Sequence, residues 1–235
     1  MNVWEHLGEL RQRLIRCIYA LFAGTIVGAF LVNPIINWLA RPVGNLVFLR
    51  PTEAFTAQVK VAVGFSFLLG LPYFLYQAWG FVSAGLEEKE RRYVRWVVPS
   101  SYLLFLAGAS LSTFVIFPKA VAFLLTLKSS SLMPMLSVES YLDFFGLLGL
   151  AFGILFQLPI VLHFLAKIGV LRSEFLEGNR RICYAGIFGL ATIFNPVPEV
   201  FTQLLLAASA IALFEISVLL VRREVRRQAP PLPKP

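Results

Sequence analysis

Residues 139–166 read ESYLDFFGLLGLAFGILFQLPIVLHFLA, and no Asp, Glu, Lys or Arg follows Asp143 in this stretch. A helix needs about 20 apolar residues to cross the hydrocarbon core of a bilayer, so this run is long enough. Five more apolar runs precede or follow it. They lie at 14–33, 58–82, 97–117, 182–195 and 200–221. The pattern predicts an all-α, polytopic membrane protein with six transmembrane helices.

The composition excludes a soluble globular protein. Of the 235 residues, 58% are hydrophobic and only 14% are charged, whereas a soluble domain carries about 25% charged residues. The net charge of +8 is therefore interpreted as loop charge of a membrane protein, not as a nucleic-acid surface.

The last two spans are the shortest. The run at 182–195 would extend only about 21 Å as a helix, and Asn195-Pro196-Val197-Pro198 ends it just before the sixth span begins. We predict a short hairpin that thins the bilayer locally. One transmembrane domain is expected over residues 1–221, followed by a basic, Pro-rich cytoplasmic tail over 222–235.

The basic residues predict the orientation. Six spans place both termini on one side, and 16 of the 21 Lys and Arg fall on that side, in the N-terminal segment, the loops after the second and fourth spans, and the tail. Because basic residues collect in cytoplasmic loops, both termini are expected in the cytoplasm.

The loop Leu86–Trp96, LEEKERRYVRW, contains three acids beside four cations. If it is helical, Glu87 and Glu88 each meet an arginine one turn away, whereas Glu90 has no cation three or four positions from it. Either Glu90 is solvated or paired across the structure, or its carboxylate is available to bind a cation of another molecule.

A second acid, Glu9, lies in HLGELRQRL on the same side of the membrane. Its ordinary interpretation is an exposed ion pair with Arg13, one helical turn away, which contributes little stability. Together, however, Glu9 and Glu90 could receive two adjacent arginines, because a guanidinium binds a carboxylate through two parallel N–H groups.

The other polar residues of the spans have structural alternatives. Glu215 lies deep enough to be a functional hypothesis by default, or it packs against a nearby Arg or Ser. Gln157 fits an interhelical hydrogen bond. Glu139, Asp143 and Glu199 are near helix N-termini, where acids are favourable.

No nucleophile–base pattern, phosphate-binding loop, dinucleotide motif or metal set occurs, so neither an enzyme nor a cofactor is expected. The alternative to a binding protein is a proton-coupled transporter of a small solute, with Glu215 and Asp143 as titrating groups. The sequence lacks the internal repeat that many transporters have, which weighs against it.

Several motifs together resemble the TatC family, the signal-peptide receptors of the twin-arginine protein translocase. The resemblance runs from about residue 4 to residue 221. Its motifs are HLGELRQRL, LPYFLYQAWGFVSAGLEEKERR, FGILFQLPI, PEVFTQ and LFEISV.

The resemblance implies a six-helix, glove-shaped, non-enzymatic protein of the prokaryotic plasma membrane, which assembles into homo- and hetero-oligomers. Its cytoplasmic face would bind twin-arginine signal peptides of folded precursors, whose export the proton-motive force drives. The matching positions for peptide binding are Glu9, Glu90, Arg11 and Phe81.

The resemblance also implies docking of single-span TatA and TatB subunits, with Gln203 at the matching polar position and Pro42 at a family proline. Three positions depart from the family pattern. Gln157 replaces a Glu, so no titrating role carries over there; Glu199 replaces an Asp; and Gly85 replaces a proline.

Overall fold

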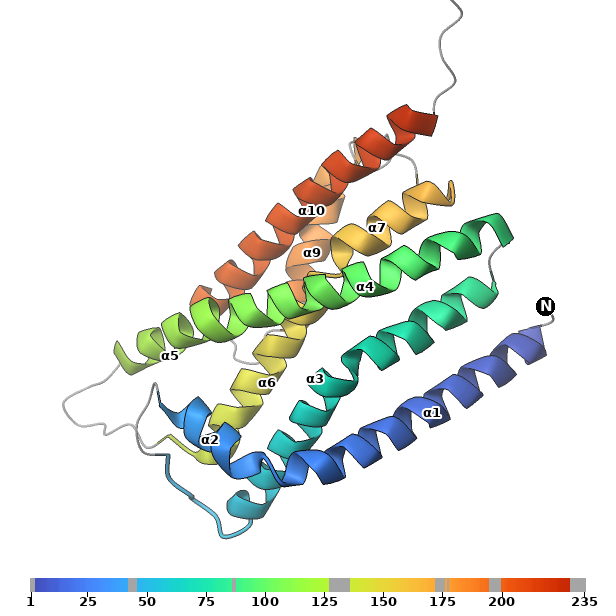
Figure 1. Cartoon of the computed structure of the whole chain (residues 1–235). Coiled ribbons are helices and arrows are strands. Elements are labelled where there is room, and N and C mark those ends of the chain that lie inside the picture. Colours follow the sequence, from blue (N-terminus) through green and yellow to red (C-terminus); the bar gives the residue numbers. More distant parts are fainter. Residues whose placement is uncertain are drawn as a thin grey trace, which may run out of the picture. The chain divides into compact units, whose positions relative to one another are not determined.

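The computed structural model describes residues 3–41, 46–85, 88–126, 136–171, 176 and 178–228, with residues 3, 88–93, 194, 201 and 224–228 described by their backbone alone. The described chain is helical apart from short connections and one isolated bridge between Val47 and Ser137, which confirms the all-α prediction (Figure 1). The helices are α1 (Val3–Ala29), α2 (Val32–Ala40), α3 (Glu53–Ala84), α4 (Glu88–Leu111), α5 (Phe117–Thr126), α6 (Val138–Leu155), α7 (Leu158–Lys167), α9 (Arg180–Phe194) and α10 (Val200–Gln228).

Four helical segments of the described chain are long and apolar enough to cross a membrane. A fifth is obtained if α1 and α2, which meet at a bend of 75°, form one span. The fifth predicted span, 182–195, corresponds to α9, which has only 15 residues. The four segments are Glu53–Ala84, Val94–Thr126, Val138–Lys167 and Thr202–Arg223.

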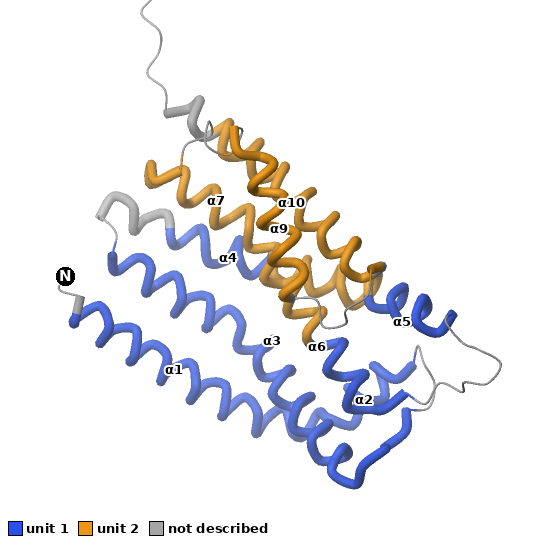
Figure 2. The backbone as a smooth tube through the Cα atoms, turned by 180° about the vertical axis from the view of Figure 1, so that it is seen from behind, with its two compact units in different colours: residues 1–103, 117–146 blue, residues 104–116, 147–235 orange. Residues whose placement is uncertain are grey.

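The chain divides into two compact units, residues 1–103 with 117–146 and residues 104–116 with 147–235 (Figure 2). In the first unit α1 and α3 pack along their length in opposite directions. Small residues allow this close packing, since a Cβ on Gly28 would stand 2.7 Å from the carbonyl oxygen of Ala62. The residues that face each other are Gly28 and Ala62, Gly24 and Ser66, Arg13 and Gln77, and His6 and Phe81.

The first unit also contains the start of α6, which is tied to the segment before α3. The backbone N–H of Val47 donates to the carbonyl of Leu136 at 3.1 Å, and that of Val138 donates to the carbonyl of Val47 at 3.1 Å. The hydroxyl of Tyr141 donates to the carbonyl of Leu39 in α2 at 2.8 Å. These bonds connect α6 to α2 and to the segment before α3 at one end of the unit.

In the second unit α10 packs against both α7 and α9. Its buried face includes the small and aliphatic side chains of Leu206, Ala210 and Val218, each at most 1% exposed. The predicted fourth span is two helices, α6 and α7, separated at Gln157. Pro159 explains the break, because it lacks the N–H that would bond to the carbonyl of Leu155.

The third span also extends further than predicted. A π-helical turn, Ser112–Ile116, joins α4 to α5, so helix continues to Thr126 instead of ending near residue 117. The wider turn precedes Pro118 and accommodates a ring that would clash within a regular α-helix.

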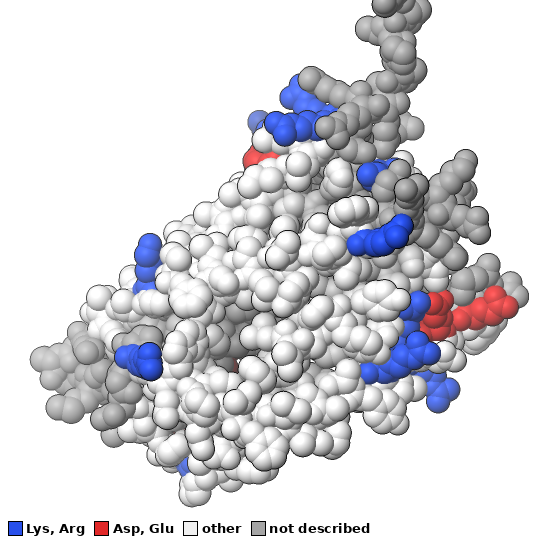
Figure 3. Space-filling model, viewed as in Figure 1, with Lys and Arg blue, Asp and Glu red and all other residues white. Residues whose placement is uncertain are grey.

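Charged side chains gather in a few places on the surface. On the face drawn in Figure 3, red and blue atoms lie mostly toward the edges of the view, with one group close to the N-terminal end of α1, whereas the broad central area is white. A broad uncharged area of this kind is typical of a surface that contacts lipid.

Candidate functional site

The N-terminal part of α1 presents an ion pair that is bonded to α3. Nη2 of Arg13 lies 2.6 Å from Oε1 of Glu9, and the side chains are 21% and 25% exposed. Nη1 of Arg13 donates to Oε1 of Gln77 at 3.1 Å. The pair is therefore half-buried and fixed from a second helix, unlike the exposed pair that spacing alone suggests.

An aromatic stack lies one turn further toward the N-terminus. The rings of His6 and Phe81 are 4.2 Å apart at their centroids and stacked at 20°. Phe81, a predicted site residue in the last turn of α3, thus contacts α1 one helical turn from Glu9. Arg11 projects from α1 as an exposed side chain. Three of the four predicted peptide-binding residues therefore lie at one end of the first unit.

Glu90 is in the first turn of α4, and its side chain is outside the described residues. It lies six positions after Ala84, the last residue of α3, and six steps along the chain span at most about 22 Å. A buried bond from Trp79 Nε1 to Ser101 Oγ, 3.1 Å long, joins α3 to α4. The chain connectivity consequently keeps the start of α4 near the end of α3 that carries Phe81.

At this end of the first unit, a half-buried carboxylate lies close to an aromatic stack. The carboxylate is that of Glu9, which is paired with Arg13. Phe81 and His6 add an aromatic surface on which an apolar or cationic side chain packs favourably.

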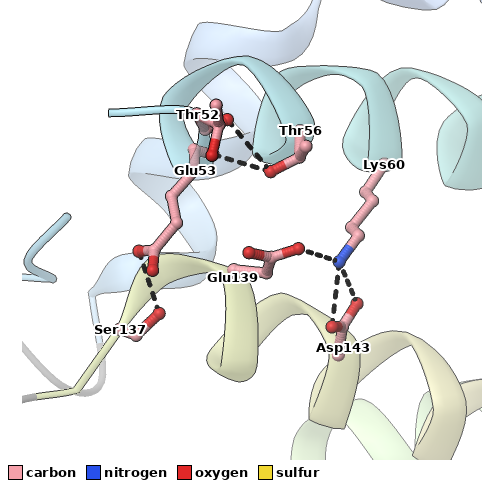
Figure 4. Close-up of polar contacts among 7 residues, drawn as sticks. All are labelled: Thr52, Glu53, Thr56, Lys60, Ser137, Glu139 and Asp143. Carbon is pink, nitrogen blue, oxygen red and sulfur yellow. Dashed lines mark hydrogen bonds and ion pairs between the residues drawn. The ribbon is translucent and has the colours of Figure 1, made fainter. Parts of the chain in front are cut away.

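The opposite end of α3 contains a second charged group, the Lys60 cluster, formed by Lys60, Glu139 and Asp143 (Figure 4). Nζ of Lys60 lies 2.8 Å from Oε1 of Glu139 and 2.8 Å from Oδ1 of Asp143. The two acids lie in the first two turns of α6, as their interpretation as helix N-terminal acids predicts. Their ion pairs to α3 show a further role, since they join α6 to α3.

Glu53 reinforces the same end of the unit. It is only 4% exposed, yet its Oε2 accepts hydrogen bonds from the N–H of Leu49 and the hydroxyl of Ser137, both at 3.0 Å (Figure 4). Two donors on one oxygen stabilise the charge of a buried carboxylate. Neither Glu53 nor the partner role of Lys60 is among the residues that the sequence pattern indicates.

In the second unit, Glu215 on α10 accepts a hydrogen bond from the Tyr184 hydroxyl on α9. Nη1 of Arg180 lies 3.4 Å from Oε1 of the same carboxylate. The interactions support the packing alternative for Glu215, a contact with a nearby Arg, and they fasten the short α9 to α10.

The remaining predicted residues are not brought together. Gln203 on α10 donates to Oγ1 of Thr192 on α9 at 2.8 Å, and Gln157 lies at the break between α6 and α7. Pro42 and Glu199 lie outside the described residues. Among the His, Cys, Asp and Glu that the structure describes, no group could hold a metal ion.

Comparison with known proteins gives the family. The profile described as "TatC: Sec-independent protein translocase protein (TatC)" matches residues 5–208. The Sec-independent protein translocase protein TatC of Carboxydothermus hydrogenoformans is 34% identical over 226 residues, covering 94% of this chain and 93% of its own. The TatC of Aquifex aeolicus is 35% identical over 236 residues, covering 97% and 98%.

The fold agrees with a solved structure. A crystal structure of the twin-arginine translocase receptor TatC superposes with a TM-score of 0.82 at 35% identity, covering 94% of this chain and all of that chain. Sequence and fold therefore match one family over nearly the entire length. The chain is a multi-pass membrane protein of the Sec-independent translocase and belongs to the TatC family.

Proposed function

We propose that the end of the first unit that carries Glu9 and the start of α4 is a receptor site for twin-arginine signal peptides. In this proposal Glu9 and Glu90 each receive one arginine of the pair, and Phe81 and Arg11 flank them. The observation that carries it is the joining of these positions through α1, α3 and α4 at one end of one unit. The solved structure with the same fold is that of a twin-arginine translocase receptor, which supports the same ligand.

The proposed site faces the cytoplasm of a prokaryotic cell, with both termini on that side of the plasma membrane. The distribution of Lys and Arg supports this orientation, since 16 of 21 fall on the side of the termini if six spans are present. A cytoplasmic site is where the signal peptide of a precursor would arrive before export.

Single-span TatA- and TatB-type subunits would dock on the second unit, where Gln203 and Thr192 bond across α9 and α10. A polar pair within an apolar surface offers interhelical hydrogen bonds to an incoming transmembrane helix. Gln157, at the break in the fourth span, offers a second such group, and Pro42 and Glu199 are proposed contributors from the family resemblance. The assembled oligomer would export folded proteins with the proton-motive force.

Peptide binding tests the receptor site. The purified chain in nanodiscs is titrated with a labelled peptide that contains paired arginines. Glu9→Gln and Glu90→Gln should each weaken binding about 10-fold to 100-fold, because each removes a charged hydrogen bond that contributes on the order of 1.5–3 kcal/mol.

Two matched controls remove a carboxylate from the same helical segments. Glu5→Gln in α1 and Glu88→Gln in α4 should leave the affinity within about twofold, as expected for substitutions away from the contact. Unchanged affinity in the Glu9→Gln, Glu90→Gln double variant would contradict the proposal.

The transporter alternative predicts solute flux. Asp143 and Glu215, its titrating groups, each form an ion pair in the structure, which favours a structural role for both. Liposomes that contain this chain alone should therefore show no uptake of small solutes. Proton-dependent uptake that is lost in Glu215→Gln would favour the transporter instead.

A further inference from the structure

One of the two carboxylate oxygens of Glu9 already accepts hydrogen bonds. Nε and Nη2 of Arg13 both donate to the same oxygen, Oε1, at 2.9 Å and 2.6 Å. Within the described part of the chain, no group donates to the other oxygen, Oε2. A guanidinium that arrives from outside would therefore meet a carboxylate with one oxygen occupied and one open.

Arg13 is itself held by α3. Its third nitrogen, Nη1, donates to the side-chain oxygen of Gln77 at 3.1 Å and approaches the backbone oxygen of the same residue at 3.5 Å. Gln77 is 5% exposed, so this acceptor has little freedom to turn away. The guanidinium fills the space that a side chain at Gly80 would need. All three nitrogens of Arg13 are thus directed by neighbours on two helices.

We propose that Arg13, which is hydrogen-bonded to Gln77, is a positioning residue of the peptide site. It fixes the Glu9 carboxylate so that Oε2 faces a peptide arginine. The inference rests on the proposed function. A side chain that is ordered before binding loses less conformational freedom when the ligand arrives, which strengthens binding. The resident cation also balances the charge of a half-buried carboxylate while the site is empty.

Orientation of Glu9 should affect arginine more than lysine. A guanidinium donates along fixed N–H directions and needs an acceptor oxygen in the correct place, whereas an ammonium on a flexible stem adapts to many placements. Loosening Glu9 should consequently reduce the preference of the site for paired arginines over paired lysines.

The test measures two affinities for each variant of the full-length chain in nanodiscs. One peptide contains paired arginines and the other is identical except for paired lysines. Arg13→Lys retains the positive charge but not the planar guanidinium, and Gln77→Leu removes the side-chain oxygen to which Arg13 donates. Arg16→Lys, an exposed arginine of the same helix, is the matched control.

Both variants should weaken binding of the arginine peptide about fivefold to tenfold, equivalent to about 1–1.4 kcal/mol, and change the lysine affinity less than twofold. The Arg13→Lys, Gln77→Leu double variant should be no weaker than the weaker single variant, because both act through one contact. Arg16→Lys should change neither affinity. Arg13→Lys alone suffices if Gln77→Leu does not fold.

Three results would overturn the inference. An equal loss of affinity for both peptides would indicate a general structural role. Tighter binding of the arginine peptide would show that Arg13 blocks Glu9. Unchanged affinities for both peptides would show that Arg13 does not contribute to peptide binding. The Glu9→Gln, Glu90→Gln variant separates this failure from failure of the receptor site. If that variant loses arginine-peptide binding while Arg13→Lys has no effect, only the positioning role is wrong.

Discussion

Replacement of Lys60 by methionine removes the cation that joins α3 to α6. Nζ of Lys60 contacts Glu139 at 2.8 Å and both oxygens of Asp143 at 2.8 and 2.9 Å. The two acids are one helical turn apart on α6, so Lys60→Met leaves two neighbouring carboxylates that repel each other. The apolar stem is retained, which isolates the effect of the charge.

The expected destabilisation lies between two limits. Removing one partner from a buried ion pair costs about 3–5 kcal/mol, whereas an exposed pair contributes about 0.2–1 kcal/mol. The side chains of Lys60, Glu139 and Asp143 are 37%, 33% and 46% exposed, so solvent screens much of the interaction. We therefore expect a loss of about 1–2 kcal/mol in the free energy of unfolding, or about 2–8 °C in melting temperature.

Thermal unfolding of the purified protein in detergent measures this loss. Lys119→Met is the matched control, since Lys119 on α5 forms no ion pair among the described residues. Neutralising the acids as well, in Lys60→Met, Glu139→Gln, Asp143→Asn, should recover most of the stability. Equal melting temperatures for Lys60→Met and Lys119→Met would refute the reasoning.

Two further substitutions test helix packing by the same assay. Gly28→Leu should destabilise the protein by about 1–3 kcal/mol, because the new side chain would clash with the Ala62 backbone. Gly64→Leu, on an open surface of α3, is the control and should not destabilise it. Equal effects of the two substitutions would contradict the close approach of α1 and α3. Trp79→Phe should cost about 0.5–1.5 kcal/mol by removing the donor to Ser101, and Ser101→Ala should add little to it, whereas fully additive losses would argue against that bond.

The fold class follows from the sequence because bilayer thickness limits it directly. The run 139–166 is long and uncharged enough that only a spanning arrangement satisfies its backbone. The short fifth run likewise corresponds to a short helix, α9. Helix ends are harder to predict, since α1 begins at Val3 in a polar segment that hydropathy does not recognise.

Contacts within a turn could be predicted, and contacts between helices could not. The spacing of Glu9 and Arg13 predicts their ion pair, which the structure contains. Gln77 is 64 residues from Arg13 and lies inside an apolar run, so no local pattern indicates that it holds the guanidinium. The only sequence feature that marks Gln77 is its polarity within an apolar span, a feature that Lys60 shares.

The central claim is that one peptide reaches both acids. A photo-crosslinking residue is placed at position 9, at position 90, or at position 60 as a control from the other end of α3, and each variant is exposed to the arginine and lysine peptides. We predict crosslinks from positions 9 and 90 to the same short region around the paired arginines, much weaker crosslinks to the lysine peptide, and none from position 60. Crosslinks from only one of positions 9 and 90, or equal yields for both peptides, would contradict the account.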